Sequence, residues 1–284
     1  MGTHELAQAE RFTLPVSVDD HCTLRCRGAN GGDVLGHGGG LYQGQHCDGY
    51  QHGGFLFILV PVYHGYRQGE KVKSMKTTLD MVSDVVCPWC WIGLRNARAA
   101  LDLLGDEVEV KTAFRPFFLD GGIPREGLEY HAYMDRKFPD KVARKAGMEH
   151  LQQAGVQVGI DFRFDKITRR PNTLNAHRLI RWAEGQDKGW EAEEALFDAF
   201  FTQGLDVGDV DTLIGIGVGL GLEEEVLTGL FASDRDVDQI TREVREAQQI
   251  GVQAVPTFIV ARSRGASGAQ PPAVLAKLLR EGAS

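Results

Sequence analysis

Two cysteines, Cys87 and Cys90, lie two residues apart in the stretch VVCPWCWIGLRNARAAL, residues 85–101. A pair with this spacing can hold half of a metal site or form a redox-active disulfide, because thiolates are both zinc ligands and nucleophiles. A β-branched run precedes the pair and a helical pattern follows it. This strand-to-helix context favours the redox interpretation over a zinc site.

The position of each cysteine predicts its role. A cysteine at the N-terminus of a helix faces unpaired backbone N–H groups and the positive end of the helix dipole, which both favour the thiolate. We therefore expect Cys87 to be the nucleophile. Cys90 follows one helical turn later on the same face, where it can resolve a mixed disulfide formed on Cys87. Pro88 suits the first helical turn, because its missing N–H costs nothing there.

Asp84, three residues before Cys87, is a candidate proton shuttle for Cys90. A carboxylate buried in an apolar strand would have a raised pKa and could accept the thiol proton. The simpler interpretation, which we favour, is a carboxylate that ends the strand in water.

The elements around this pair follow a readable order. Residues 77–86 predict a buried strand, the helix after the cysteines ends at Gly105, and residues 108–118 predict a second, parallel strand. The remaining expected elements are six helical segments, then a helix, a strand and a final helix, at residues 126–138, 140–154, 172–184, 189–203, 209–220, 222–231, 236–250, 255–261 and 271–281.

This order resembles a thioredoxin fold interrupted by a helical domain. The stretches SDVVCPWCWIG, RPNTLNAHRLI, QQIGVQAVPTFIV and SGAQPPAVL resemble the DsbA-like family, specifically its cytoplasmic FrnE-type branch. That branch is similar to 2-hydroxychromene-2-carboxylate isomerases and kappa-class glutathione transferases. The resemblance implies an α/β protein with a thioredoxin-like domain (residues 75–122 and 233–284) and an inserted all-helical domain (residues 123–232).

The resemblance also implies further site residues. The Val255–Pro256 bond is expected to be cis, with the backbone of Val255 pairing with an extended substrate and Pro256 crowding out a metal. Asn172, Asn175 and His177 match a stretch that lies near the substrate in the isomerase relatives. For Asn172 the simpler interpretation is a helix N-cap, and for His177 a residue on a helix surface.

Pro88 and Trp89, between the cysteines, are expected to contact the substrate. Trp89 replaces the histidine of the best-known strongly oxidising family members, and an indole supplies no positive charge to a thiolate. Potentials of such folds span roughly −270 to −120 mV, and we expect this protein toward the reducing end.

Residues 1–74 differ from the rest of the chain. They hold six of the nine histidines and 14 of the 35 glycines without a sustained helical or strand period. We expect a mostly disordered extension that is not native, with Met75 as the natural start. A zinc site is the alternative, but the spacing of its ligands fits no common pattern; these ligands are Cys22, Cys26, His37, His46 and Cys47.

Composition limits the partners and the compartment. A net charge of −8 and a pI near 5.6 argue against nucleic-acid and anionic-membrane partners. The apolar run at residues 54–63 is too short to span a membrane and too far from Met1 for a signal peptide. We expect a cytoplasmic protein; its oligomeric state is not predicted.

We therefore predict a thiol–disulfide oxidoreductase that acts as oxidase, reductase or isomerase of protein disulfides through Cys87 and Cys90. It needs no metal or nucleotide cofactor, and glutathione is a candidate redox partner. One alternative is a glutathione-dependent isomerase or transferase of small aromatic substrates, but those relatives carry a serine at the position of Cys87. Another is a polypeptide-binding chaperone module.

Overall fold

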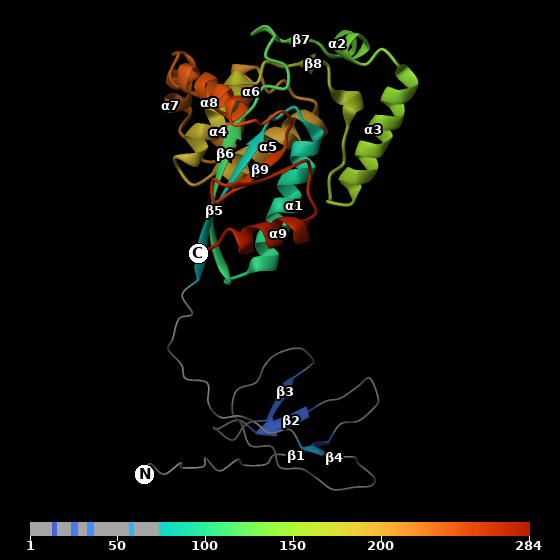
Figure 1. The fold of residues 1–284 in the computed structure, drawn as a ribbon, viewed down its shortest axis with the longest axis vertical. Coiled ribbons are helices and arrows are strands. Elements are labelled where there is room, and N and C mark those ends of the chain that lie inside the picture. The colour runs from blue at the N-terminus through green and yellow to red at the C-terminus, as the bar shows by residue number, and fades with distance from the viewer. Residues whose placement is uncertain (1–12, 16–23, 28–32, 37–56, 60–73) are drawn as a thin grey trace. The chain divides into compact units, whose positions relative to one another are not determined.

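The computed structural model describes residues 13–15, 24–27, 33–36, 57–59 and 74–284 (Figure 1). The chain divides into two units, Met1–Val72 and Lys73–Ser284. In the first unit, β1 (Thr13–Pro15) pairs with β4 (Phe57–Leu59), and β2 (Leu24–Arg27) pairs with β3 (Asp33–Gly36), both antiparallel.

The predictions for residues 1–74 fall largely outside the described residues. Of the five candidate zinc ligands, only Cys26 is in a described element, β2, and its side chain is not described. The disordered extension, the start at Met75 and the zinc alternative therefore stay predictions.

A mixed four-stranded sheet forms the centre of the second unit. Its order is β10-β9-β5-β6. β5 (Met75–Ser83) runs parallel to β6 (Val108–Pro116) and antiparallel to β9 (Thr257–Val260), and β10 (Arg264–Ser267) pairs antiparallel with β9. β5 and β6 agree with the parallel strands expected at residues 77–86 and 108–118, and β9 agrees with the strand expected at residues 255–261.

Helices cover both faces of this sheet. Successive residues of a strand point to opposite faces, so neighbouring residues of β5 contact different helices. Met81 on β5 belongs to the main core with Ala97 of α1 (Pro88–Leu104) and Leu275 of α9 (Pro272–Glu281). Val82, the next residue of β5, packs instead in a smaller cluster with Ala247 of α8 (Val237–Gln249). The strand that leads into the cysteine pair is thus buried on both sides.

The segment between β6 and α8 is mainly helical. Its elements are β7 (Leu128–Glu129), α2 (Tyr130–Lys137), α3 (Lys141–Val156), a 3-10 helix (Phe164–Lys166), β8 (Arg169–Arg170), α4 (Leu174–Glu184), α5 (Gly189–Asp198) with a π-helical end (Ala199–Gln203), α6 (Val210–Gly219) and α7 (Glu224–Phe231).

Two details of this segment correct the sequence-based expectation. The insertion is not all-helical, because β7 and β8 pair antiparallel. The helix expected from residue 126 begins only at Tyr130, because the Glu129 carboxylate accepts hydrogen bonds from the backbone N–H groups of His131 and Ala132 and so caps the helix there.

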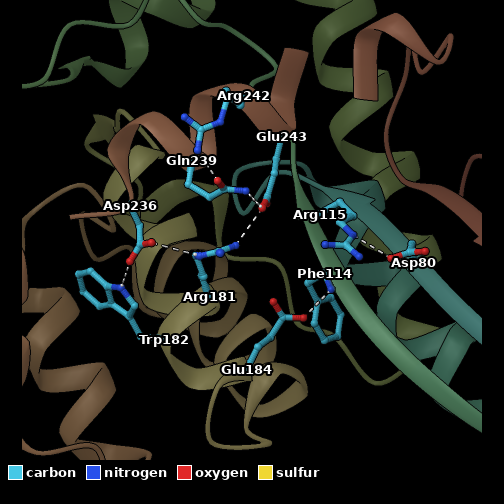
Figure 2. A network of polar contacts seen from close by, with 10 residues as sticks. All are labelled: Asp80, Phe114, Arg115, Arg181, Trp182, Glu184, Asp236, Gln239, Arg242 and Glu243. Atoms are coloured by element: carbon cyan, nitrogen blue, oxygen red, sulfur yellow. Dashed lines mark hydrogen bonds and ion pairs between the residues drawn. The ribbon is translucent and has the colours of Figure 1, made fainter. Parts of the chain in front are cut away.

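A charged network ties the insertion to the sheet (Figure 2). On α4, Arg181 donates to Glu243 of α8 at 2.8 Å and lies 3.4 Å from Asp236. At the end of α4, the Glu184 carboxylate accepts the backbone N–H of Phe114 on β6 at 2.7 Å. The helix α4 is therefore fixed between β6 and α8.

The start of α1 packs closely against the loop before β9, and a glycine permits this approach. A Cβ on Gly93 would lie 2.9 Å from Cγ of Pro256 and 3.2 Å from Cζ of Phe258. Both atoms belong to rings inside a packed core, so neither can yield easily.

We predict that Gly93→Ala lowers the free energy of unfolding by about 1–3 kcal/mol, because it forces α1 away from Pro256. Urea unfolding measures the change. The matched control is Gly147→Ala on α3, where no atom lies within 4 Å of the added Cβ; helix propensity there should raise stability by roughly 0.5–1 kcal/mol. Equal stability of the two variants would contradict the close packing.

Candidate functional site

The cysteine pair lies where β5 gives way to α1. Cys87 is the N-cap of α1 with extended backbone angles (φ −99°, ψ 110°), and Pro88 is the first helical residue. The Cys87 N–H donates to the Asp84 carbonyl at 2.9 Å, and the Cys90 N–H donates to the Cys87 carbonyl at 3.0 Å. These two backbone bonds fix the turn and hold Cys87 at the helix N-terminus.

Both sulfurs are free thiols that differ in burial. Cys87 is 5% exposed and Cys90 is 0% exposed. Burial raises the pKa of the Cys90 thiol well above its ordinary value, and the hydrogen bond and charge of the neighbouring Cys87 act in the same direction. Cys90 is therefore a protonated thiol at neutral pH and must lose its proton before it can attack a disulfide.

The loop before β9 lies beside Cys87. The Val255–Pro256 peptide bond is cis, as the resemblance implied. The Cys87 thiol donates to the Val255 carbonyl with 3.6 Å between Sγ and O. Val255 is half-buried and Pro256 is buried. The loop therefore lies within the packed part of the chain, with a backbone carbonyl against the Cys87 sulfur.

Asp84 and His177 lie close to each other near the cysteine turn. Their burial contradicts the interpretations of Asp84 as a strand end in water and of His177 as a helix-surface residue. Asp84 is 1% exposed rather than in water, and His177 is 3% exposed rather than on a helix surface. His177 Nε2 lies 3.6 Å from the Asp84 carboxylate and 3.2 Å from the Phe117 carbonyl. The backbone N–H of Leu119 donates to the other Asp84 oxygen at 2.8 Å.

The pKa of Asp84 is lowered, whereas the proton-shuttle hypothesis expected it to be raised. Burial alone would raise this pKa, but the nearby His177, the charge of Arg170 and the Leu119 N–H together outweigh it. Asp84 is therefore a fixed anion and a weak base. Its role in the fold is to hold the residues after β6 against the cysteine turn.

A second buried carboxyl group belongs to Glu193 on α5, which was not predicted from the sequence as a site residue. Glu193 is 0% exposed, its Oε1 accepts from the Ser83 hydroxyl at 2.7 Å, and its Oε2 has no hydrogen-bond partner among the described residues. Burial raises its pKa to about 7. The available signal was its place on the apolar stripe of α5, three and four residues before Leu196 and Phe197.

An apolar groove of about 530 Å³ opens beside Trp89, the residue between the cysteines. It lies between α2, α3 and the start of α1, and the Trp89 ring is 5.6 Å from that of His150. Lys137 and Arg144 add positive charge to its lining. Its apolar lining consists mainly of Trp89, Met134, Phe138, Met148 and Leu151.

The structure places Asn172 and Asn175 elsewhere. Both line a smaller, polar hollow together with Arg125 and Arg178, and no residue of the cysteine turn contributes to it. Asn172 accepts the Leu174 N–H at 3.1 Å, so it caps α4 from the position before the N-cap residue Thr173. Of the three residues in the matched stretch, only His177 lies near the cysteine turn, through its contact with Asp84.

The part of the chain that the structure describes lacks two features. Within it, no group of three or more His, Cys, Asp or Glu side chains is arranged to hold a metal ion. No helix there is both long enough and apolar enough to cross a membrane.

Comparisons with known proteins agree with this geometry. Residues 78–280 match the family described as a DSBA-like thioredoxin domain. An uncharacterised protein of Bacillus subtilis, YwbO, is 26% identical over 187 residues, which cover 66% of this chain and 88% of YwbO.

Two solved structures are similar in fold. A probable DsbA oxidoreductase from Streptomyces coelicolor is 26% identical with a TM-score of 0.67, over 72% of this chain and 89% of that one. The cytosolic disulfide reductase DsbM from Pseudomonas aeruginosa, solved with glutathione, is 18% identical with a TM-score of 0.53, over 72% and 98% of the two chains. The thioredoxin-like α/β fold expected from the sequence is thus confirmed.

Glu193 should make stability depend on pH. Its pKa is raised from 4.5 to about 7 in the folded chain, so the folded state binds this proton more tightly than the unfolded state. The free energy of unfolding should therefore fall as pH rises from 4.5 to about 7, by up to roughly 3 kcal/mol at about 1.4 kcal/mol per pKa unit.

We predict that Glu193→Gln, which has no such proton, becomes more stable relative to the native chain at pH 8 than at pH 5. Urea unfolding at the two pH values measures this difference. Glu191→Gln, at an exposed position of the same helix, is the control and should keep the native pH dependence. An unchanged pH dependence in Glu193→Gln would contradict the raised pKa.

Proposed function

This chain belongs to the DSBA-like thioredoxin domain family, and we propose that it is a thiol–disulfide oxidoreductase that works through Cys87 and Cys90. One observation carries the proposal. Two free thiols lie at the N-terminus of α1, the outer one against the carbonyl that precedes a cis-proline and the inner one fully buried. This arrangement suits a nucleophile and a resolving thiol.

The reaction proceeds in two exchanges. The Cys87 thiolate attacks a substrate disulfide, forms a mixed disulfide with one substrate sulfur and releases the other as a thiolate. The Cys90 thiol then loses its proton and attacks the Cys87 sulfur, so that the Cys87–Cys90 disulfide forms and the second substrate thiolate leaves. Two electrons pass from the protein to the substrate, and the reverse sequence oxidises a substrate dithiol.

The direction of electron flow depends on the residues between the cysteines. Pro88 and Trp89 are uncharged, so neither adds positive charge that would stabilise the thiolate. We therefore expect the reduction potential of the Cys87–Cys90 disulfide to lie toward the reducing end of the range for such folds. A cytoplasmic thiol such as glutathione would then reduce this disulfide again. A disulfide reductase or isomerase fits this position better than a strong oxidase.

Substrate recognition involves two neighbouring surfaces. We infer that an extended substrate segment adds to the loop before β9 and pairs with the backbone of Val255, which lies beside the Cys87 sulfur. The groove beside Trp89 offers apolar surface to side chains near the attacked disulfide. This groove would also serve the chaperone alternative, as one part of the same activity on polypeptides.

We predict that Cys87→Ser abolishes the reaction with a disulfide-bonded peptide, because no nucleophile remains. Cys90→Ser should instead accumulate a mixed disulfide on Cys87, because the resolving thiol is missing. Mass spectrometry of the intact protein after mixing distinguishes the two. Full turnover in both variants would refute the proposal, and a glutathione-dependent conversion of a small aromatic substrate that survives Cys87→Ser would support the isomerase alternative.

We predict that Phe138→Ser lowers the rate with an unfolded-protein disulfide about tenfold, as expected when part of one apolar side chain is no longer buried on binding. The rate with glutathione disulfide should not change. Phe138 is 46% exposed, so the fold should tolerate the change. Val142→Ser on α3 is the control, because Val142 is 81% exposed and does not line the groove. Equal rates for both variants would exclude the groove from substrate binding.

A further inference from the structure

A small polar hollow lies at the start of α4, beside the end of α7 and the start of α8. It holds about 150 Å³, less than the roughly 300–1,000 Å³ of pockets that take larger ligands. No residue of the cysteine turn lines it, so the proposed redox reaction does not account for it. The polar side chains of its lining are those of Arg125, Asn172, Asn175, Arg178, Ser233 and Asp234.

Arg178 on α4 carries a buried positive charge into this hollow and is only 2% exposed. Its guanidinium donates to the side-chain oxygen of Asn175 at 2.8 Å and to three backbone carbonyls, those of Leu230, Ser233 and Arg235. These four acceptors are neutral groups with only partial negative charge, and no described carboxylate forms a salt bridge with Arg178. Buried charges in proteins are normally paired, so the hollow lacks an anion.

The carboxylates of this region do not supply that anion. Asp236 accepts the Trp182 indole N–H at 2.9 Å and lies 3.4 Å from Arg181, so its charge is already shared (Figure 2). Asp234 lines the hollow, but it is exposed and forms no salt bridge with Arg178. The charge of Arg178 therefore remains largely uncompensated inside the hollow.

Arg125 brings a second guanidinium group to the same hollow. It is exposed and has no salt bridge with a described carboxylate. Burial lowers the pKa of Arg178, and the positive charge of Arg125 acts in the same direction, because two like charges repel each other. An anion between the two guanidinium groups would replace this repulsion by two attractive contacts.

The first turn of α4 adds backbone donors at the hollow. The Leu174 N–H is taken by the Asn172 side chain at 3.1 Å, whereas the N-cap residue Thr173 makes no side-chain hydrogen bond to the helix. The N–H groups that follow Leu174 are therefore available to a ligand, and the positive end of the helix dipole lies here. Leu174 and Asn175 both line the hollow, so this helix end borders it.

We propose that this hollow binds a phosphate group between the guanidinium groups of Arg125 and Arg178 and the first turn of α4. A dianion compensates two guanidinium groups and a helix N-terminus better than a carboxylate does, and the arginine fork matches phosphate oxygens. Arg125 and Asp234 are exposed, so the hollow meets solvent beside them and leaves room for the remainder of a phosphomonoester. The inference does not depend on the proposed redox reaction.

Isothermal titration calorimetry at pH 8 in a constant chloride background tests the inference, with inorganic phosphate, phenyl phosphate and acetate as probes. We expect one phosphate site per chain. Arg125→Gln should weaken phosphate binding about 10- to 100-fold, as expected when a hydrogen bond between charged groups is lost. Asp234→Asn should tighten it, because a negative charge leaves the lining. Arg136→Gln, exposed on α2 and outside the hollow, is the control and should bind as the native protein does.

Thermal unfolding gives a second readout. Phosphate also stabilises proteins without a binding site, because it is excluded from their surfaces. The rise in Tm in phosphate relative to chloride at equal ionic strength should therefore be smaller in Arg125→Gln than in the native protein and in Arg136→Gln.

The three probes identify the ligand. Phenyl phosphate that binds as tightly as inorganic phosphate supports a phosphomonoester, and binding of inorganic phosphate alone supports the free ion. Acetate that binds as tightly as phosphate overturns the assignment to a phosphate group. The absence of binding by both phosphate probes, or equal affinities of the native protein and Arg125→Gln, overturns the site itself.

Discussion

The site depends on the close contact between the first two turns of α1 and the loop before β9. Gly93 leaves room for the Pro256 ring, and this contact sets the Val255 carbonyl 3.6 Å from the Cys87 sulfur. The sheet supports both partners, because β5 leads into the cysteine turn and β9 follows the proline while the two strands pair with each other. A shift between these strands would separate the Cys87 sulfur from the Val255 carbonyl.

The two parts of the second unit contribute different features of the site. The thioredoxin-like part carries the sulfurs and the cis-proline, and the inserted segment surrounds them with charge and apolar surface. Glu193 comes from α5, His177 from α4, and the groove beside Trp89 from α2 and α3. The insertion thus surrounds the two cysteines, while Arg181 and Glu184 hold its helix α4 to α8 and to β6.

The sequence predicted the parts of the site that depend on local patterns. The position of Cys87 at a helix start follows from the strand before it and Pro88 after it, and the cis bond at Pro256 followed from a family resemblance. Burial of charged side chains could not be predicted in this way, because it depends on distant segments. His177 is buried through contacts with residues 60 and more positions away, and Glu193 through Ser83 at a separation of 110.

The contact between Glu184 and β6 bears on the association of separate molecules through the edges of their sheets. Among the described strands, β6 is an outer strand of the sheet, and such an edge offers free backbone groups to the strands of other molecules. Glu184 occupies the Phe114 N–H, and the Trp190 indole donates to the Thr112 side chain at 2.8 Å on the same strand. These side chains from the insertion occupy part of the edge around Thr112 and Phe114, which disfavours pairing with a strand of another molecule there.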